Sequence, residues 1–239
     1  MPHSADALPC APCIVRSGTL DDYRGLAHLH YRGGPPATVA REPGGGPSIL
    51  AARDGGGRLA GVLVVSMPTL NGAWRSLAWP GLFDTGDKRR DALAINNTLR
   101  CISRVIVDPR FRGQGVARAL VRASLERAST PCTEAVAAMG HLCPFFASAG
   151  MTAYPLAPSA RDARLADALA SVGVEPWEVL EPRAATRTLA RHPWLAREAR
   201  TWANHSQSTR RHMRADPVAL LQLAASHAAQ PPVAYAHTR

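Results

Sequence analysis

The segment from Cys101 to Ala128 constrains the fold of this chain strongly, because its pattern changes twice over a short distance. Residues 101–107, CISRVIV, are rich in β-branched side chains and predict a strand that is buried on both faces. The glycine-containing stretch DPRFRGQG follows, and residues 116–128 then carry apolar side chains at the spacing of one helix face. A strand, a glycine-rich turn and a helix in succession indicate a mixed α/β protein.

Further strand and helix signals lie on both sides of this segment. β-rich runs predict strands at residues 13–16, 48–53, 58–67, 132–139 and 151–156. Asp54–Gly57, DGGG, predicts a hairpin turn between the second and third of these strands, because glycine and aspartate tolerate positive φ angles. Thr19 and Asp22 predict a capping box at the start of a helix, and residues 144–149 predict a short helix that ends at Gly150.

Two segments lack a regular pattern. Residues 33–47 contain too many glycines and prolines for a helix or a strand, and they predict a mobile loop or a lid over a site. Residues 68–100 predict irregular structure, with Trp74 and Trp79 near a basic cluster at residues 88–90. Aromatic and basic side chains together can stack on a nucleic acid and neutralise its charge.

The composition changes after the last predicted strand, and from there the sequence carries helix signals only. Ser159 and Asp216 are typical residues at the start of a helix. We therefore expect two parts, a main domain at residues 1–158 and a basic helical appendage at residues 159–239. The arginines of the appendage would form a surface for nucleic acid or for an acidic protein. An ordinary solvated helix face explains them equally well.

The charge of the chain favours acidic partners. Its 28 Lys and Arg residues against 18 Asp and Glu residues give a formal net charge of +10. Phosphorylated cofactors, nucleic acids and acidic proteins fit this charge. Lys88 is the only lysine, however, so a coding bias of the genome would explain the many arginines as well.

Membrane insertion, secretion and metal binding are not expected. No apolar stretch approaches the roughly 20 residues that a membrane helix needs. The N-terminal residues MPHSADALPCAPC have no basic start and no continuous apolar core, and they predict a cytoplasmic protein without a secretory signal. The five cysteines are odd in number and scattered, which predicts reduced thiols. Cys10 and Cys13 have a C-x-x-C spacing, but no second pair follows at zinc-finger spacing.

The turn between the predicted strand and helix at residues 108–118 has the chemistry of an anion site. Amide groups at a helix N-terminus point toward a ligand, and the helix dipole favours negative charge there. Gly113 and Gly115 let the backbone approach closely, and three arginines add positive charge. A P-loop is excluded because no glycine here precedes Lys-Ser or Lys-Thr, and a Rossmann fingerprint because Arg118 stands where a small residue is needed. The pattern therefore predicts a phosphate or pyrophosphate site.

The same stretch, VIVDPRFRGQGVARALV, resembles the acetyl-CoA motif of the GNAT superfamily of N-acetyltransferases. Residues 112–117, RGQGVA, match its signature of Gln or Arg, two variable positions, Gly, one variable position, and Gly or Ala. PFFASAGM at residues 144–151 resembles a later segment of the family, and the resemblance covers about residues 13–156. More narrowly, the chain resembles the acetyltransferase-type domain attached to some prokaryotic ABC-type ATPases, although it has no Walker motif.

The resemblance implies a mixed α/β fold with a mostly antiparallel, twisted sheet whose two central parallel strands splay apart. It also implies an acetyl-CoA-dependent N-acetyltransferase that passes the acetyl group directly to an amine. Main-chain groups of Val105, Ile106 and Val107 would pair with the pantetheine arm of acetyl-CoA. The residues that would bind its pyrophosphate are Arg112, Gly113, Gln114, Gly115, Val116, Ala117 and Arg118.

The catalytic groups that are usual in the family are altered here. Phe146 stands at the position of the tyrosine acid, and the predicted strand at residues 101–107 carries no carboxylate. The ordinary pKa of histidine, about 6.5, suits a general base. The candidates to replace the usual groups are His141 and Ser103, followed by Cys143 and Glu134.

Two hypotheses therefore stay open. In the first, the chain is an N-acetyltransferase whose acceptor amine belongs to a small molecule, a protein or a nucleic acid. In the second, it is a GNAT-fold module with little or no catalysis that binds nucleic acid through its basic surface. The sequence leaves open the acceptor, the acyl group and the oligomeric state, a dimer included, and it predicts no membrane partner.

Overall fold

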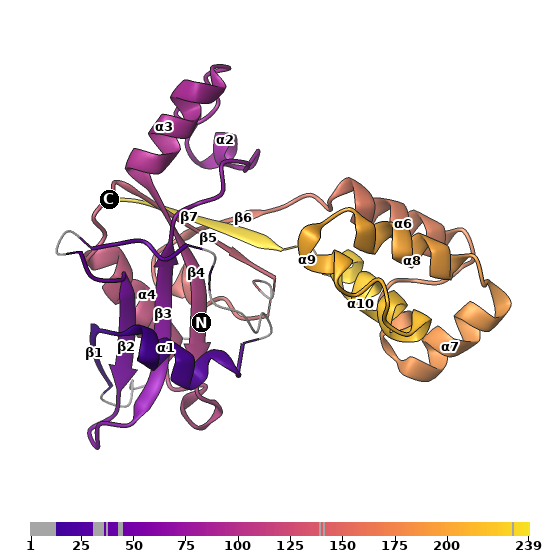
Figure 1. Cartoon of the computed structure of the whole chain (residues 1–239), viewed down its shortest axis with the longest axis horizontal. Coiled ribbons are helices and arrows are strands. Elements are labelled where there is room, and N and C mark those ends of the chain that lie inside the picture. Colours follow the sequence, from indigo (N-terminus) through magenta and orange to yellow (C-terminus); the bar gives the residue numbers. More distant parts are fainter. Residues whose placement is uncertain are drawn as a thin grey trace, which may run out of the picture. The chain divides into compact units, whose positions relative to one another are not determined.

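The computed structural model describes residues 13–30, 36, 38–42, 45–138, 140, 142–230 and 232–239 of the chain. The chain divides into two compact units (Figure 1). The first consists of Met1–Tyr154 and Val233–Arg239, and the second consists of Pro155–Pro232. The second unit is thus an insertion within the first.

A seven-stranded sheet with the order β1-β2-β3-β4-β5-β7-β6 lies at the centre of the first unit (Figure 1). Its strands are β1 (Ile14–Ser17), β2 (Ile49–Arg53), β3 (Leu59–Ser66), β4 (Leu99–Val107), β5 (Cys132–Ala137), β6 (Thr152–Pro155) and β7 (Val233–Thr238). The pairs β1–β2, β2–β3, β3–β4 and β5–β7 are antiparallel, whereas β4 and β5 are parallel. This arrangement confirms the predicted mixed, mostly antiparallel sheet with a parallel pair at its centre.

Short local signals set several of these elements. The hairpin turn between β2 and β3 forms as predicted, because the Asp54 carboxylate accepts hydrogen bonds from the amides of Gly56 (2.9 Å) and Arg58 (2.8 Å). The capping box also forms, since the Asp22 amide donates to the Thr19 hydroxyl and the Thr19 amide donates to the Asp22 carboxylate. The helices of this unit are α1 (Leu20–Ala27), α2 (Arg75–Ala78), α3 (Lys88–Thr98), α4 (Val116–Glu126) and α5 (Phe145–Ser148), with a 3₁₀ turn η1 at Pro109–Phe111.

The prediction of irregular structure at residues 68–100 is wrong, because this segment contains both α2 and α3. Asp87 begins α3, and its carboxylate accepts hydrogen bonds from the amides of Arg89 and Arg90. Within α3 only Ile95 is buried. A helix that buries a single side chain has no repeating apolar positions along its sequence. The hydrophobic pattern of residues 68–100 therefore did not predict α3.

The predicted mobile loop at residues 33–47 is partly packed against the sheet. Ala40 is buried, its amide donates to the Val65 carbonyl (2.9 Å), and its carbonyl accepts from the Ser48 amide (2.8 Å). These bonds hold the described part of the loop beside β3.

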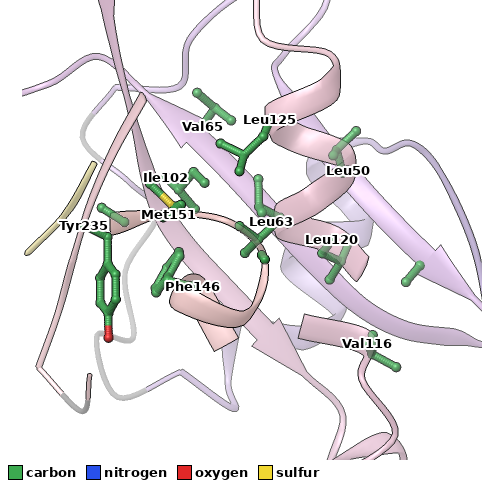
Figure 2. Close-up of a cluster of buried hydrophobic side chains, with 14 of the residues drawn as sticks. Leu50, Leu63, Val65, Ile102, Val116, Leu120, Leu125, Phe146, Met151 and Tyr235 are labelled. Atoms are coloured by element: carbon green, nitrogen blue, oxygen red, sulfur yellow. The ribbon is translucent and has the colours of Figure 1, made fainter. Parts of the chain in front are cut away.

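Two apolar clusters cover the two faces of the sheet. On one face, Leu120 and Leu125 of α4 pack with Leu63, Ile102 and Phe146 (Figure 2). On the other face, the buried side chains that pack together come from α1, β2, β3 and β4, and they are Tyr23, Leu26, Ile49, Ala51, Val62, Val64 and Ile106. Helix α4 is therefore fixed against the strands that position the glycine turn.

The second unit is helical and has its own core. Its elements are α6 (Ala160–Ala170), η2 (Glu178–Leu180), α7 (Pro182–Arg191), α8 (Leu195–Asn204), α9 (Gln207–Arg210) and α10 (Pro217–Ala229). Ser159 and Asp216 cap α6 and α10 as predicted, because each side chain accepts hydrogen bonds from amides of the first turn. Leu165, Leu195 and Trp202 are among its fully buried side chains.

The prediction that the helical region extends to residue 239 is wrong. After α10 the chain returns to the sheet as β7, which pairs antiparallel with β5 from Cys132↔Thr238 to Ala137↔Val233. All of the first four residues of β7 are buried, so this short strand shows no alternation of apolar and polar residues.

Candidate active site

The two central parallel strands separate beyond their first residues. They pair only from Leu99↔Cys132 to Ile102↔Ala135, although β4 continues to Val107. Beyond Ile102, the edge of β4 that faces β5 has no strand partner among the described residues. The register with β3 also shifts at this point, so that Ser103 is the extra residue of a β-bulge. Free main-chain groups on a separated strand edge are able to pair with an extended ligand.

Val105, Ile106 and Val107 lie on this free stretch of β4. On its other edge β4 is paired with β3, through Leu63↔Val105 and Gly61↔Val107. The three residues predicted to pair with the pantetheine arm are therefore on a strand that is rigidly held from one side and open on the other. Their contact with a cofactor stays a prediction.

The glycine turn follows directly at the end of β4. Gly113 and Gly115 have φ angles of 76° and 78°, a left-handed conformation that glycine adopts without strain. Gly115 begins α4, and no side chain caps this helix. No oxygen of the described residues accepts a hydrogen bond from the amides of residues 113–118, and Ala119 is the first to bond, to the Gly115 carbonyl. The turn thus presents several unpaired amides at the positive end of a helix, which suits an anion.

One of the arginines in this turn is already engaged. Arg110 binds the Asp108 carboxylate with two hydrogen bonds, of 3.0 Å from Nε and 2.8 Å from Nη2. Arg112 is exposed, and its side chain donates to the Val107 carbonyl from Nε, at 3.4 Å. Arg112 and Arg118 form no ion pair with the described residues. Their charges, rather than that of Arg110, are available to a ligand.

The Asp108–Arg110 interaction gives a testable pH dependence. The Arg110 side chain and backbone amide hold the pKa of the Asp108 carboxyl at about 2, below its ordinary value of 3.8. A carboxyl whose pKa is lowered in the folded state stabilises the turn above its ordinary pKa, and this contribution is lost as the pH falls through about 2. We expect carbon-13 NMR titration to show this midpoint in the wild type and a higher one in Arg110→Met. Equal midpoints in the two proteins would contradict the assignment.

Ser103 and His141 were predicted as catalytic groups. The Ser103 hydroxyl lies 2.6 Å from the Ser66 hydroxyl and 3.2 Å from the Val64 carbonyl, so it has partners within the sheet. His141 lies outside the described residues. Cys143 is exposed. The catalytic role of Ser103 stays a prediction, and the structure shows it in addition as part of the bulge in β4.

Glu134, the fourth candidate, is a buried ion-pair partner. Its two carboxylate oxygens accept hydrogen bonds from Nε (2.8 Å) and Nη2 (2.7 Å) of Arg75 in α2. The side chains are only 4% and 3% exposed, respectively. A carboxylate held by both oxygens is not free to accept a proton from an amine. The pair instead fixes α2 to β5.

The aromatic residues of the segment at 68–100 are packed in the protein. Trp79 is buried, its ring lies 5.6 Å from that of Phe83, and its indole N–H donates to the Thr238 hydroxyl (2.9 Å). Trp74 packs against Trp79 and Tyr154, with 6.0 Å between the ring centroids in each case. The hypothesis that both tryptophans stack on a nucleic acid is therefore wrong for Trp79.

Phe146 has a buried tyrosine beside it. Phe146 is 5% exposed, and its ring centroid lies 5.0 Å from that of Tyr235 in β7 (Figure 2). The Tyr235 hydroxyl donates to the Gly140 carbonyl (3.1 Å), and burial, with a smaller effect of Cys143, raises its pKa. A raised pKa makes the Tyr235 hydroxyl a weaker acid than an ordinary tyrosine, so its position beside Phe146, rather than its pKa, makes it a candidate proton donor. Sequence reasoning missed it, because its strand lies within the region predicted to be helical.

Two further features are absent from the described part of the chain. No three His, Cys, Asp or Glu side chains there converge in a way that could hold a metal ion. No described helix has the length and apolar character needed to cross a bilayer.

Part of the chain is similar to known proteins. Residues 34–150 match the model of the acetyltransferase (GNAT) family. A GNAT-family N-acetyltransferase from Escherichia coli, solved in complex with CoA, is 18% identical over 63% of this chain and 73% of that chain, with a TM-score of 0.34. Arylalkylamine N-acetyltransferase 2 from Aedes aegypti is 17% identical over 60% of this chain and 86% of its own, with a TM-score of 0.35. A search of curated proteins found no match. Residues 34–150, just under half of the chain, are therefore similar to the acetyltransferase domain of the GNAT family.

Proposed function

We propose that the protein transfers an acetyl group from acetyl-CoA directly to an amine. The observation that carries this proposal is the row of unpaired amides at residues 113–118, at the end of the free edge of β4. The pyrophosphate of acetyl-CoA would accept hydrogen bonds from these amides, with Arg112 and Arg118 beside it. The pantetheine arm would then extend along Val105–Val107, which brings the thioester toward the bulge at Ser103.

The chemistry needs a proton acceptor and a proton donor. The neutral amine attacks the thioester carbonyl, the C–N bond forms, the C–S bond breaks, and the amine loses one proton while the thiolate gains one. His141 and Ser103 are the proposed groups for proton removal. Tyr235 replaces the missing tyrosine acid in this proposal, because its ring lies beside that of Phe146.

Calorimetry with acetyl-CoA tests the first step of this proposal. The wild type should show saturable binding, and Arg112→Ala should bind more weakly by about 1.5–3 kcal/mol, because a charge-assisted contact is lost. Arg122→Ala is the matched control, since Arg122 is an exposed arginine of α4 outside the turn. The proposal would be overturned if the wild type did not bind acetyl-CoA, or if the two variants lost acetyl-CoA affinity equally. A turnover assay with small amines, proteins and nucleic acids then identifies the acceptor.

Nucleic-acid binding is a second candidate function, and α7 and α8 favour it. Arg183, Arg187 and Arg191 are exposed and spaced by four residues, so they share one face of α7. Arg197 and Arg200 are exposed on α8, and none of these five arginines forms an ion pair with the described residues. DNA affinity that falls steeply with salt would support this function. The narrower resemblance to domains attached to ABC-type ATPases stays an expectation.

A further inference from the structure

A cavity of about 450 Å³ lies at the end of the sheet opposite to the glycine turn. Arg100 and Thr133 are part of its lining, and they are paired across the first residues of β4 and β5. The nine residues of β4 separate this end of the sheet from the glycine turn by roughly 25 Å. The cavity is therefore separate from the proposed acetyl-CoA site.

The lining is strongly cationic. It contains four arginines, Arg16, Arg41, Arg100 and Arg127, and a single acid, Glu42. None of these arginines forms an ion pair with any described residue. Positive charges that no carboxylate balances attract an anion, and this attraction is stronger in a concave site than on an open surface.

Arg100 and Arg127 are held in place by main-chain carbonyls, as Arg41 is by the Gly45 carbonyl (3.1 Å). Arg100 Nη1 donates to the carbonyls of Asn96 (2.8 Å) and Leu99 (2.7 Å), and burial lowers its pKa. Arg127 Nη2 donates to the Val15 carbonyl (3.2 Å). These carbonyls orient the two groups without neutralising them. Their other N–H groups can donate to an anionic ligand. Because the two side chains are already held in place, they lose less conformational entropy on binding than freely rotating arginines would.

The remaining lining groups fit the rest of a small phosphorylated molecule. Ser17, Ser48 and Ser124 are part of the lining, and serine hydroxyl groups can donate hydrogen bonds to phosphate oxygens. Leu50 and Val65 form an apolar part, and both lie near Leu125 of α4 (Figure 2). The volume lies within the usual range for small-molecule sites.

We propose that this cavity binds a small organic phosphate through Arg100 and Arg127. Phosphate fits better than a carboxylate because arginine and hydroxyl donors together match three or more oxygens around one phosphorus. This proposal does not depend on the proposed acetyl transfer, since the two sites share no residue.

The test uses the full chain with excess CoA present, so that any phosphate site at the glycine turn is filled. Ribose 5-phosphate and inorganic phosphate are the probes in calorimetry, and ribose is the uncharged control. We expect saturable binding of both phosphates and none of ribose. Arg100→Gln and Arg127→Gln should each weaken binding at least about tenfold. Arg122 is exposed on α4 and lies outside the cavity, so Arg122→Gln should leave phosphate binding unchanged.

Several outcomes would overturn the proposal. The first is the failure of both phosphates to bind, and the second is an equal loss of phosphate affinity in all three variants. The third is tighter binding of citrate, a carboxylate, than of ribose 5-phosphate. Loss of DNA binding in the Arg100 and Arg127 variants without any phosphate affinity would indicate a nucleic-acid surface instead. Circular dichroism of each variant establishes that it is folded. Acetyl-CoA binding, measured separately, distinguishes failure of this proposal from failure of acetyl transfer.

Discussion

Replacing Glu134 with glutamine is expected to lower the free energy of unfolding of the sheet by about 3–5 kcal/mol. Both partners of the Arg75–Glu134 pair are almost fully buried and are joined by two hydrogen bonds. The substitution leaves the Arg75 charge buried without a counter-charge, and such a charge is costly because water cannot solvate it. Native-state hydrogen exchange at the β5 amides measures the change, because exchange from a central strand reports opening of the sheet.

A double variant separates the buried charge from other effects. Adding Arg75→Met removes the unpaired charge, so the double variant should lose less stability than the two single variants lose in sum. Asp21→Asn is the control, because Asp21 pairs with Arg24 at the surface, where the side chains are 84% and 72% exposed. We expect this control to change stability by less than about 1 kcal/mol. If Glu134→Gln also lowered the free energy of unfolding by less than about 1 kcal/mol, the Arg75–Glu134 pair would contribute little to stability.

The second large effect is expected at Gly113, in acetyl-CoA binding. Gly113 has a positive φ angle, and a Cβ atom there would meet no other atom within 4 Å. Asparagine and aspartate both tolerate this conformation and have nearly the same shape. Gly113→Asp places a negative charge at the proposed pyrophosphate site, so we expect it to bind acetyl-CoA on the order of 100-fold more weakly than Gly113→Asn. Calorimetry at low and high salt measures the difference, which should decrease with salt.

The control for this experiment is Gly86→Asp. Gly86 also has a positive φ angle and open space around a Cβ atom, but it precedes α3 rather than the glycine turn. Its acetyl-CoA affinity should equal that of the wild type. Equal affinities of Gly113→Asp and Gly113→Asn would mean that the pyrophosphate does not lie at this turn.

The features that could be predicted from the sequence depend on neighbouring residues. The Thr19–Asp22 capping box and the Asp54–Gly57 hairpin turn each form from a few consecutive residues, and each was confirmed. The β4–turn–α4 unit is also continuous in sequence, so its glycines and its helix start could be located before the structure was known.

The features that could not be predicted depend on residues far apart in the chain. No local pattern connects Arg75 with Glu134, because the pair forms only when α2 packs on β5. Likewise, nothing within VAYAHT shows that it pairs with Cys132–Ala137, and the preceding helices suggested that the helical region continued. Tyr235 was overlooked for the same reason, although it lies beside the Phe146 ring.

The insertion of the helical unit between β6 and β7 has a consequence for biosynthesis. Cys132 pairs with Thr238, so β5 cannot pair with β7 until the whole helical unit has emerged from the ribosome. Pairing of segments this distant is slow, since the intervening chain loses entropy when the ends meet. During synthesis the edge of β5 is exposed to other chains. Early folding of the helical unit would bring β7 close to β5 sooner, and the insert would then assist the completion of the sheet.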